Sequence, residues 1–171
     1  MSFNIDNYIK KVADFPKKGI LFYDISPLLC DYEAWNNTLD SLCDKIKDIK
    51  PDLLVAIESR GFLIAAALSL KLKIGFSLIR KKGKLPGEVI SQPYSLEYNK
   101  DSLEIQVNSI KKNQKVLIID DVLATGGTIN ASIDLLSKLD ANILGCLCLI
   151  ELKKLNGRQH INIPCYSVIE Y

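Results

Sequence analysis

The sequence contains only one histidine, one methionine and one tryptophan, and its five cysteines form no CxxC pair. A metal site built from histidine and cysteine is therefore not predicted. The longest apolar run, residues 62–70 with Ser69 included, is far shorter than the roughly 20 residues that a membrane-spanning helix needs. Neither GxGxxG nor GxxxxGK[ST] occurs, so the usual dinucleotide fingerprint and the P-loop of nucleoside triphosphatases are both missing.

Charge of one sign is also scarce, because 22 Lys and Arg residues face 20 Asp and Glu residues and leave a net charge of +2. This balance predicts neither a nucleic-acid partner nor a membrane partner, and any anion-binding site must be local. The odd number of cysteines and a start without the features of a signal peptide predict a reducing, cytoplasmic location.

The 171 residues suit one domain, and apolar runs alternate with amphipathic stretches along them. This alternation predicts an α/β fold with a mostly parallel sheet. We expect helices over 32–49, with Asp31 as the N-cap, from the turn at residues 58–61 to about residue 71, and after the ATGGT segment at residues 124–128. Residues 80–98 show no sustained spacing of apolar residues, which predicts a long loop. The expected strands are 53–57, 75–79, 102–107, 115–121, 143–151 and 166–169.

The segment VLIIDDVLATGGT, residues 116–128, carries the strongest chemical signal. It places Asp120 and Asp121 at the end of a buried strand, just before a glycine-containing loop and a helix N-terminus. Backbone N–H groups, hydroxyls and the helix dipole at such a loop bind a phosphate monoester. The two carboxylates can accept hydrogen bonds from ribose hydroxyls. The predicted ribose-phosphate site therefore adds to these acids the loop residues Ala124, Thr125, Gly126, Gly127 and Thr128.

This motif resembles the phosphoribosyl pyrophosphate (PRPP) motif of type I phosphoribosyltransferases. FPKKGILFYDISPLL (15–29), ESRGF (58–62), LIRKKGKLPG (78–87) and YSLEY (94–98) resemble, in order, the signatures of the branch that uses adenine. The resemblance implies one phosphoribosyltransferase domain over residues 1–171, with a mostly parallel sheet and a small base-binding hood from about residues 1–30. It also implies transfer of the phosphoribosyl group from PRPP to adenine, giving AMP and diphosphate in purine salvage. Mg²⁺ carried by the substrate rather than by protein ligands, and a homodimer, are expected with it.

The same resemblance assigns a pyrophosphate-binding role to four residues. Arg60 is also expected to act in catalysis, since a guanidinium stays charged and holds two phosphate oxygens in a fork. For Lys81 and Lys82, a solvated surface role and a functional role stay equally open. The four residues are Ser59, Arg60, Arg80 and Lys84.

Glu97 and Tyr98 match the catalytic lid of the family. Adenine must lose its N9 proton as it attacks C1′, and a carboxylate suits that task. Glu97 either removes this proton directly, stabilises charge through N7, or serves only in a salt bridge. Tyr98 corresponds to the aromatic residue that helps to close the site and exclude water.

Leu21, Phe22 and Tyr23 match the adenine-binding positions of the hood. Many relatives have Arg or Lys where this sequence has Tyr23, which leaves room for another purine such as hypoxanthine, guanine or xanthine. Phe15 and Phe22 fit the core of the hood at least as well as a stacking contact with the base. A noncatalytic PRPP sensor is a more distant alternative, since it would not need Arg60, Lys84 and Glu97 together.

Two further features carry a structural interpretation. His160 lies in a polar stretch and is expected on the surface. Cys146 and Cys148 alternate along an expected strand and predict buried, apolar thiols.

Overall fold

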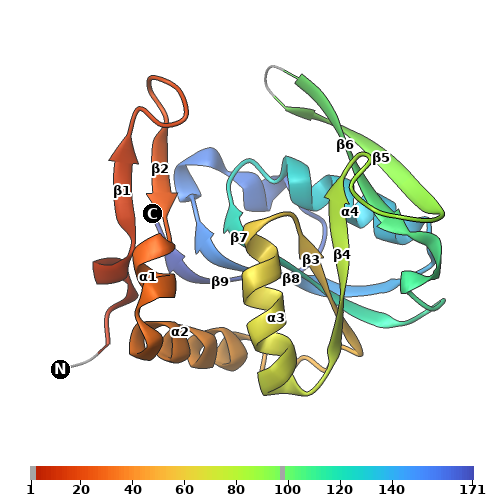
Figure 1. Ribbon diagram of the computed structural model, residues 1–171, viewed down its shortest axis with the longest axis horizontal. Coiled ribbons are helices and arrows are strands. Elements are labelled where there is room, and N and C mark those ends of the chain that lie inside the picture. The colour runs from red at the N-terminus through yellow and green to blue at the C-terminus, as the bar shows by residue number, and fades with distance from the viewer. Residues whose placement is uncertain (1–2, 97–98) are drawn as a thin grey trace. The chain divides into compact units, whose positions relative to one another are not determined.

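The computed structural model describes residues 3–96 and 99–171 (Figure 1). The pattern of contacts along the backbone divides the chain into two compact units, Met1–Leu42 and Cys43–Tyr171. No helix within the described ranges has the length and apolar character needed to span a membrane.

The first unit is built on a β-hairpin. A short 3₁₀ helix η1 (Ile5–Tyr8) precedes strands β1 (Lys10–Ala13) and β2 (Leu21–Asp24), which pair antiparallel. Helices α1 (Ser26–Cys30) and α2 (Tyr32–Lys45) follow. The N–H of Ala34 donates to Asp31 Oδ1 over 2.9 Å, which confirms the predicted N-cap. Helix α2 ends at Lys45, one turn earlier than its apolar period predicts.

A seven-stranded sheet forms the second unit, in the order β5-β6-β4-β3-β7-β8-β9. Strands β4, β3, β7, β8 and β9 are parallel, whereas β5 and β6 form an antiparallel ribbon at one edge. The predicted α/β fold with a mostly parallel sheet is confirmed. The strands are β3 (Leu53–Ile57), β4 (Gly75–Lys81), β5 (Val89–Leu96), β6 (Asn99–Gln106), β7 (Lys115–Leu123), β8 (Asn142–Glu151) and β9 (Cys165–Glu170).

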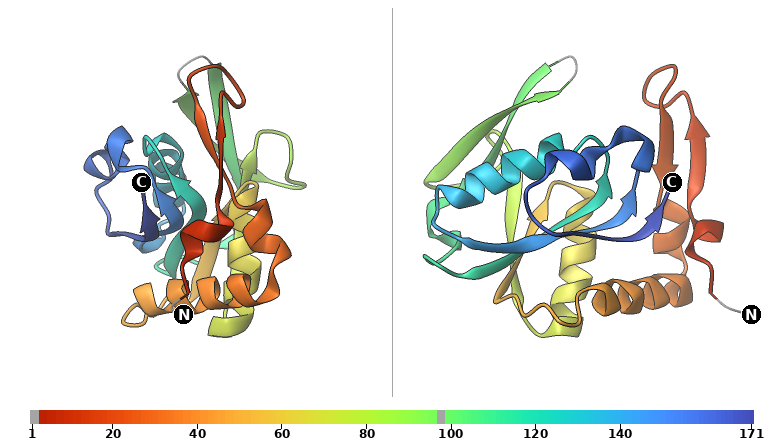
Figure 2. Two further views of the ribbon diagram at one scale, coloured as in Figure 1. Left: turned by 90° about the vertical axis from the view of Figure 1, so that its left-hand side faces the viewer. Right: turned by 180° about the vertical axis from the view of Figure 1, so that it is seen from behind.

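Helices α3 (Arg60–Leu72) and α4 (Gly127–Ser137) lie on opposite faces of this sheet (Figure 2). They connect β3 to β4 and β7 to β8, and the two connections leave the adjacent strands β3 and β7 in opposite directions. Right-handed crossovers therefore place the helices on opposite faces. The C-terminal ends of β3 and β7 meet at a topological switch point, where open α/β sheets bind ligands. Short 3₁₀ helices η2 (Val107–Ser109), η3 (Lys153–Leu155) and η4 (Gly157–His160) complete the unit.

Strand β5 corrects the prediction of an unbroken loop over residues 80–98. It escapes detection because it lacks a regular alternation and contains Pro93, which has no N–H to donate. A proline is tolerated here because β5 is the outermost strand of the sheet. Its partner β6 also begins at Asn99, earlier than predicted, because pairing with β5 extends it.

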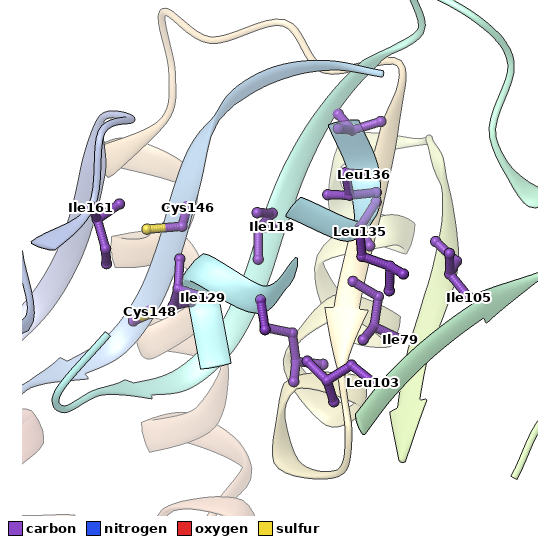
Figure 3. Packing of buried hydrophobic residues seen from close by; sticks show 14 of the residues in the cluster. Ile79, Leu103, Ile105, Ile118, Ile129, Leu135, Leu136, Cys146, Cys148 and Ile161 are labelled. Atoms are coloured by element: carbon purple, nitrogen blue, oxygen red, sulfur yellow. The ribbon is translucent and has the colours of Figure 1, made fainter. Parts of the chain in front are cut away.

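One cluster of core residues lies between α4 and the sheet (Figure 3). Leu135 and Leu136 of α4 pack over strand residues such as Ile118, and both are fully buried. Burying a side chain of this size stabilises the fold by about 1.5–3 kcal/mol. Cys146 and Cys148 are also buried here, as predicted, and His160 is exposed, as predicted.

Candidate active site

Two acidic side chains lie at the C-terminal end of β7 in the second unit. Asp120 and Asp121 are 9% and 6% exposed, which is unusual for carboxylates. The N–H of Asp121 donates to Oδ1 of Asp120 over 2.9 Å. Oδ2 of Asp121 is buried and receives no hydrogen bond from the residues that the structure describes. Its nearest cation is Arg60, described next, and carboxylate oxygens at this strand end can also accept hydrogen bonds from hydroxyl groups of a ligand.

Arg60 brings a positive charge to this carboxylate pair. Its Nε lies 2.8 Å from Asp121 Oδ2, and its side chain is one-third exposed. The next residue, Gly61, makes this approach possible. A Cβ at Gly61 would lie 2.7 Å from the carbonyl oxygen of Ile119 and 3.3 Å from Cα of Asp120. Only glycine therefore lets the first turn of α3 lie directly against β7.

Burial raises the pKa of Asp120 well above its usual range, and the neighbouring Asp121 carboxylate raises it further. Burial also raises the pKa of Asp121, although the Arg60 guanidinium partly opposes this increase. Two adjacent carboxylates in a partly enclosed site favour a shared proton or a cationic ligand. The carboxylate pair therefore favours binding of a ligand that brings hydroxyl donors and positive charge.

The turn after β3 forms a second side of the site. The peptide bond between Glu58 and Ser59 is cis. The Glu58 carboxylate accepts hydrogen bonds from Nε and Nη2 of Arg80, each 3.2 Å long, and from the N–H of Lys81 over 3.0 Å. Burial tends to raise the pKa of Glu58, but the bonds from Arg80 and Lys81 outweigh it and lower the pKa. Glu58 therefore ties the turn to β4.

These groups surround one cavity of about 430 Å³ within the second unit. Its walls come from the turn after β3, from β4 to β7, and from the first turn of α4. Ser59, Arg60 and the carboxylate pair therefore border the same space. The lining residues are Glu58, Ser59, Arg60, Lys81, Tyr94, Leu103, Asp120, Asp121 and Thr128.

A smaller cavity of about 50 Å³ adjoins the loop between β7 and α4. We call this loop, residues 124–128, the phosphate loop. Gly126 has a left-handed φ of +85°, which turns the chain into α4. The N-terminus of the 11-residue helix then contributes N–H groups and a positive dipole end. The small cavity is lined by Val122, Ala124, Thr125, Gly126, Gly127, Thr128 and Ile129.

The structure brings most of the residues predicted for PRPP to these two cavities. Arg80 lies behind Glu58, where its Nη1 also donates to the carbonyl oxygen of Lys84 over 3.1 Å. The Lys84 side chain is exposed.

The predicted adenine-binding residues Leu21, Phe22 and Tyr23 lie on β2 of the first unit. The Phe22 ring meets Phe15 edge to face with centroids 5.0 Å apart, but Phe15 is 51% exposed and does not lie in a core of the described residues. Glu97 and Tyr98 lie outside the described residues.

Three polar residues of the larger cavity, and the apolar Leu103, were missed or left open by the sequence. Glu58 belongs to the ESRGF segment, where only Ser59 and Arg60 were chosen. Lys81, for which the sequence left a surface role and a functional role equally open, lines the cavity. Its Nζ lies 3.5 Å from Oδ2 of Asp101. Burial, followed by the charge and hydrogen bond of Asp101, raises the pKa of Tyr94. The signal for Tyr94 was its place in YSLEY, at the start of the predicted lid.

Within the described residues, no group of three or more His, Cys, Asp or Glu side chains is arranged to hold a metal ion. Asp120 and Asp121 alone offer oxygen ligands of the kind that Mg²⁺ accepts. They fit a magnesium ion only if a ligand contributes further oxygens.

Comparisons with known proteins agree with this geometry. Residues 36–171 match the family model of the phosphoribosyl transferase domain. The chain is 49% identical over 168 residues to adenine phosphoribosyltransferase from Rhodospirillum rubrum and 51% identical over 168 residues to that from Rhodospirillum centenum, covering 98% of each chain in both cases.

Solved structures give the same result. The crystal structure of adenine phosphoribosyltransferase from Thermoanaerobacter pseudethanolicus matches with a TM-score of 0.95 and 43% identity, over 98% of both chains. The Giardia lamblia enzyme in complex with 9-deazaadenine matches with a TM-score of 0.92 and 35% identity, over 98% of this chain and 96% of that one.

Proposed function

Since the chain belongs to the adenine phosphoribosyltransferases, a family of the phosphoribosyl transferase domain, we propose that it converts adenine and PRPP to AMP and diphosphate for purine salvage. The observation that carries this proposal is one cavity in which Asp120, Asp121 and Arg60 lie together beside the phosphate loop. The proposed activity is that of a pentosyltransferase.

The ribose 5-phosphate part of PRPP occupies the β7 side of the site. Asp120 and Asp121 accept hydrogen bonds from its two ribose hydroxyls, and the ion pair with Arg60 holds the Asp121 carboxylate in position. Backbone N–H groups and the hydroxyls of Thr125 and Thr128 hold the 5′-phosphate. Binding both ends of the sugar fixes the position of C1′ for attack.

The pyrophosphate leaving group lies toward the turn after β3. Arg60 and the backbone at Ser59 bind its oxygens, and Arg80 and Lys84 add positive charge. Asp120 and Asp121 would lie next to the Mg²⁺ that PRPP carries, and the ion would supply further neutralisation of the leaving group. The protein thus stabilises the negative charge that develops on the departing diphosphate.

Adenine N9 forms a bond to C1′ as the bond from C1′ to the pyrophosphate oxygen breaks, with inversion at C1′. The N9 proton leaves to the Glu97 carboxylate, and Tyr98 helps to close the site. The first unit supplies the base-binding hood, in which Leu21, Phe22 and Tyr23 contact adenine. These roles rest on the family resemblance of the residues.

We also propose a homodimer whose contact surface includes α3. Leu63 and Leu70 lie two turns apart on one face of this helix and are 46% and 81% exposed. Phe76 at the start of β4 is exposed as well. An apolar surface of this kind is typical of an interface with a second copy of the chain. The buried free thiols of Cys146 and Cys148 fit the reducing cytoplasm that the composition predicts.

Nucleotide formation from PRPP and Mg²⁺ tests the reaction, with adenine, hypoxanthine, guanine and xanthine assayed in parallel. We expect turnover with adenine alone, measured as kcat/KM, because discrimination between bases resides in that ratio. Turnover of an oxopurine instead would show that a chain with Tyr23 at this position is specific for another purine base. Binding of PRPP without turnover of any base would indicate the noncatalytic sensor.

A further inference from the structure

A segment from the C-terminal part of the chain lies against the phosphate loop. This segment, residues 152–161, contains η3 and η4 and forms most of the connection from β8 to β9. Its Gly157 is buried, and a Cβ there would overlap the carbonyl oxygen of Ala124 and lie 2.9 Å from the nitrogen of Gly126. In the reverse direction, a Cβ at Gly126 would lie 2.8 Å from the carbonyl oxygen of Gly157. The two backbones are therefore in direct contact at the turn that presents N–H groups to the phosphate.

Arg158, the next residue, holds this segment in place. Its Nε donates to Glu151 Oε1 over 2.9 Å, and its Nη2 donates to Glu151 Oε2. Its Nη1 donates to the carbonyl oxygen of Cys165 on β9. Glu151 is only 2% exposed and also accepts a 2.8 Å hydrogen bond from the Ser167 hydroxyl. A forked arginine pair of this kind fixes both distance and angle.

Weaker attachments hold the two ends of the segment. Asn130, in the first turns of α4, donates from Nδ2 to the carbonyl oxygen of His160 over 2.8 Å. The N–H of Leu152 donates to the carbonyl oxygen of Leu123 over 2.9 Å. Ile161 belongs to the hydrophobic core cluster that includes Cys146 (Figure 3). Of the attachments named here, that of Arg158 is the one made by a residue next to the glycine that touches the phosphate loop.

We propose that Arg158 is a positioning residue for the 5′-phosphate of PRPP. Its fork to Glu151 presses Gly157 against residues 124–126 and holds the phosphate loop in its binding conformation before PRPP arrives. This inference rests on the proposed function, since it assigns the loop to the ribose 5-phosphate group. Arg158 itself lines neither cavity and acts through Gly157.

The physical reason is the conformational freedom of the loop. Two adjacent glycines and a left-handed Gly126 leave residues 124–128 with many accessible conformations. A loop that must be ordered on binding loses affinity, whereas a loop already held in place does not. Pyrophosphate binds through the separate turn at Ser59 and Arg60, so its affinity does not depend on the contact between Gly157 and the phosphate loop.

The test compares the full-length protein with Arg158→Lys and Gly157→Ala. Lysine keeps a positive charge opposite Glu151 but loses the fork, and alanine displaces the loop directly. Titration calorimetry with ribose 5-phosphate and, separately, with pyrophosphate measures the two subsites. We expect each variant to bind ribose 5-phosphate about tenfold more weakly or worse, since small displacements far from the chemistry have such effects. Affinity for pyrophosphate stays unchanged, and KM for PRPP rises while kcat and KM for adenine stay the same.

Lys154→Ala is the matched control, because Lys154 is an exposed cation in the same segment. It should bind both ligands as the wild type does. Ser167→Ala removes one hydrogen bond to Glu151 without changing charge, and we expect a smaller loss in the same direction. This milder variant keeps the test decisive if Arg158→Lys does not fold.

An equal loss of affinity for both ligands, or none for either, would overturn the inference, because a general loss of structure does not discriminate between subsites. The failure of the proposed function has a different signature. It would appear as wild-type protein that forms no nucleotide from PRPP with any purine base, whatever the variants bind.

Discussion

The Nε atom of Arg60 lies 2.8 Å from Oδ2 of Asp121 and joins the first turn of α3 to the end of β7. Arg60 begins the connection from β3 to β4, and Asp121 lies on β7, whose own connection to β8 leaves in the opposite direction. In the proposed reaction, one of them binds the leaving group and the other binds the sugar. Their contact sets the separation of these two subsites, and with it the position of C1′ between them.

Replacing Asp121 tests this relationship. Asp121→Asn keeps the size of the side chain but removes the charge that attracts Arg60. We expect kcat/KM for PRPP to fall about a hundredfold, equivalent to about 2.7 kcal/mol of transition-state stabilisation. Steady-state kinetics with varied PRPP measures the effect. Asp140→Asn, at an exposed ion pair with Lys112, is the control and should retain the wild-type value. Full activity in Asp121→Asn would contradict the ribose assignment.

A second prediction concerns the close approach at Gly61. Gly61→Ala places a methyl group 2.7 Å from the carbonyl oxygen of Ile119, so α3 must move away from β7. We expect a loss of about 1–3 kcal/mol in the free energy of unfolding, as for other overpacked sites, and a marked loss of kcat/KM as Arg60 leaves Asp121. Denaturant unfolding and steady-state kinetics measure the two effects.

Gly75→Ala provides the comparison for this prediction. A Cβ at Gly75 would meet only Leu53 Cδ1, at 3.5 Å, which is an ordinary van der Waals contact. Its activity and stability should stay close to those of the wild type. Equal stability and equal kcat/KM of Gly61→Ala and Gly75→Ala would show that α3 and β7 accommodate a methyl group between them without loss.

The sequence predicts those parts of the site that are local. Residues 115–121 form a continuous apolar run that ends in two acids, and the glycines after it leave few alternatives to a turn into a helix. The strand, the phosphate loop and α4 are therefore where the sequence places them.

Contacts between distant residues could not be predicted in this way. Glu58 and Arg80 are 22 positions apart, and their contact depends on β3 and β4 lying side by side. Gly157 lies about 30 positions from the phosphate loop that it touches, and nothing in its neighbours indicates that loop. Strand β5 forms because it pairs with β6. Pro93 argues against a strand when the sequence is considered alone, since proline cannot donate a hydrogen bond to a neighbouring strand.

The third prediction is a dependence of stability on pH. Burial and the Asp121 carboxylate raise the pKa of Asp120, whereas in the unfolded chain this group titrates near 3.9. Between these two pKa values the folded protein binds more protons than the unfolded chain, so stability falls as the pH rises through the folded pKa. Asp120→Asn removes this penalty and keeps an oxygen that accepts the N–H of Asp121.

We therefore expect Asp120→Asn to melt higher than the wild type at pH 7, by about 3 °C for each 1 kcal/mol gained. The difference should shrink as the pH falls and vanish below about 3, where the wild-type carboxyl is protonated in both states. Thermal melts across this pH range measure it, with Asp140→Asn as the control. A variant less stable than the wild type at neutral pH would show that charged Asp120 stabilises the fold.

The final prediction concerns oligomeric state. Leu70 is the most exposed large apolar residue of α3, at 81%, and lies on the same face as Leu63. If a second copy covers this face, Leu70→Glu places a charge inside an apolar interface, where it lacks a partner and costs several kcal/mol. Light scattering after size-exclusion chromatography should show a dimer for the wild type and a monomer for Leu70→Glu. Leu155→Glu introduces the same charge at another exposed leucine, away from α3, and should leave the dimer intact. A wild-type monomer, or a dimer that both variants retain, would place the interface elsewhere or exclude it.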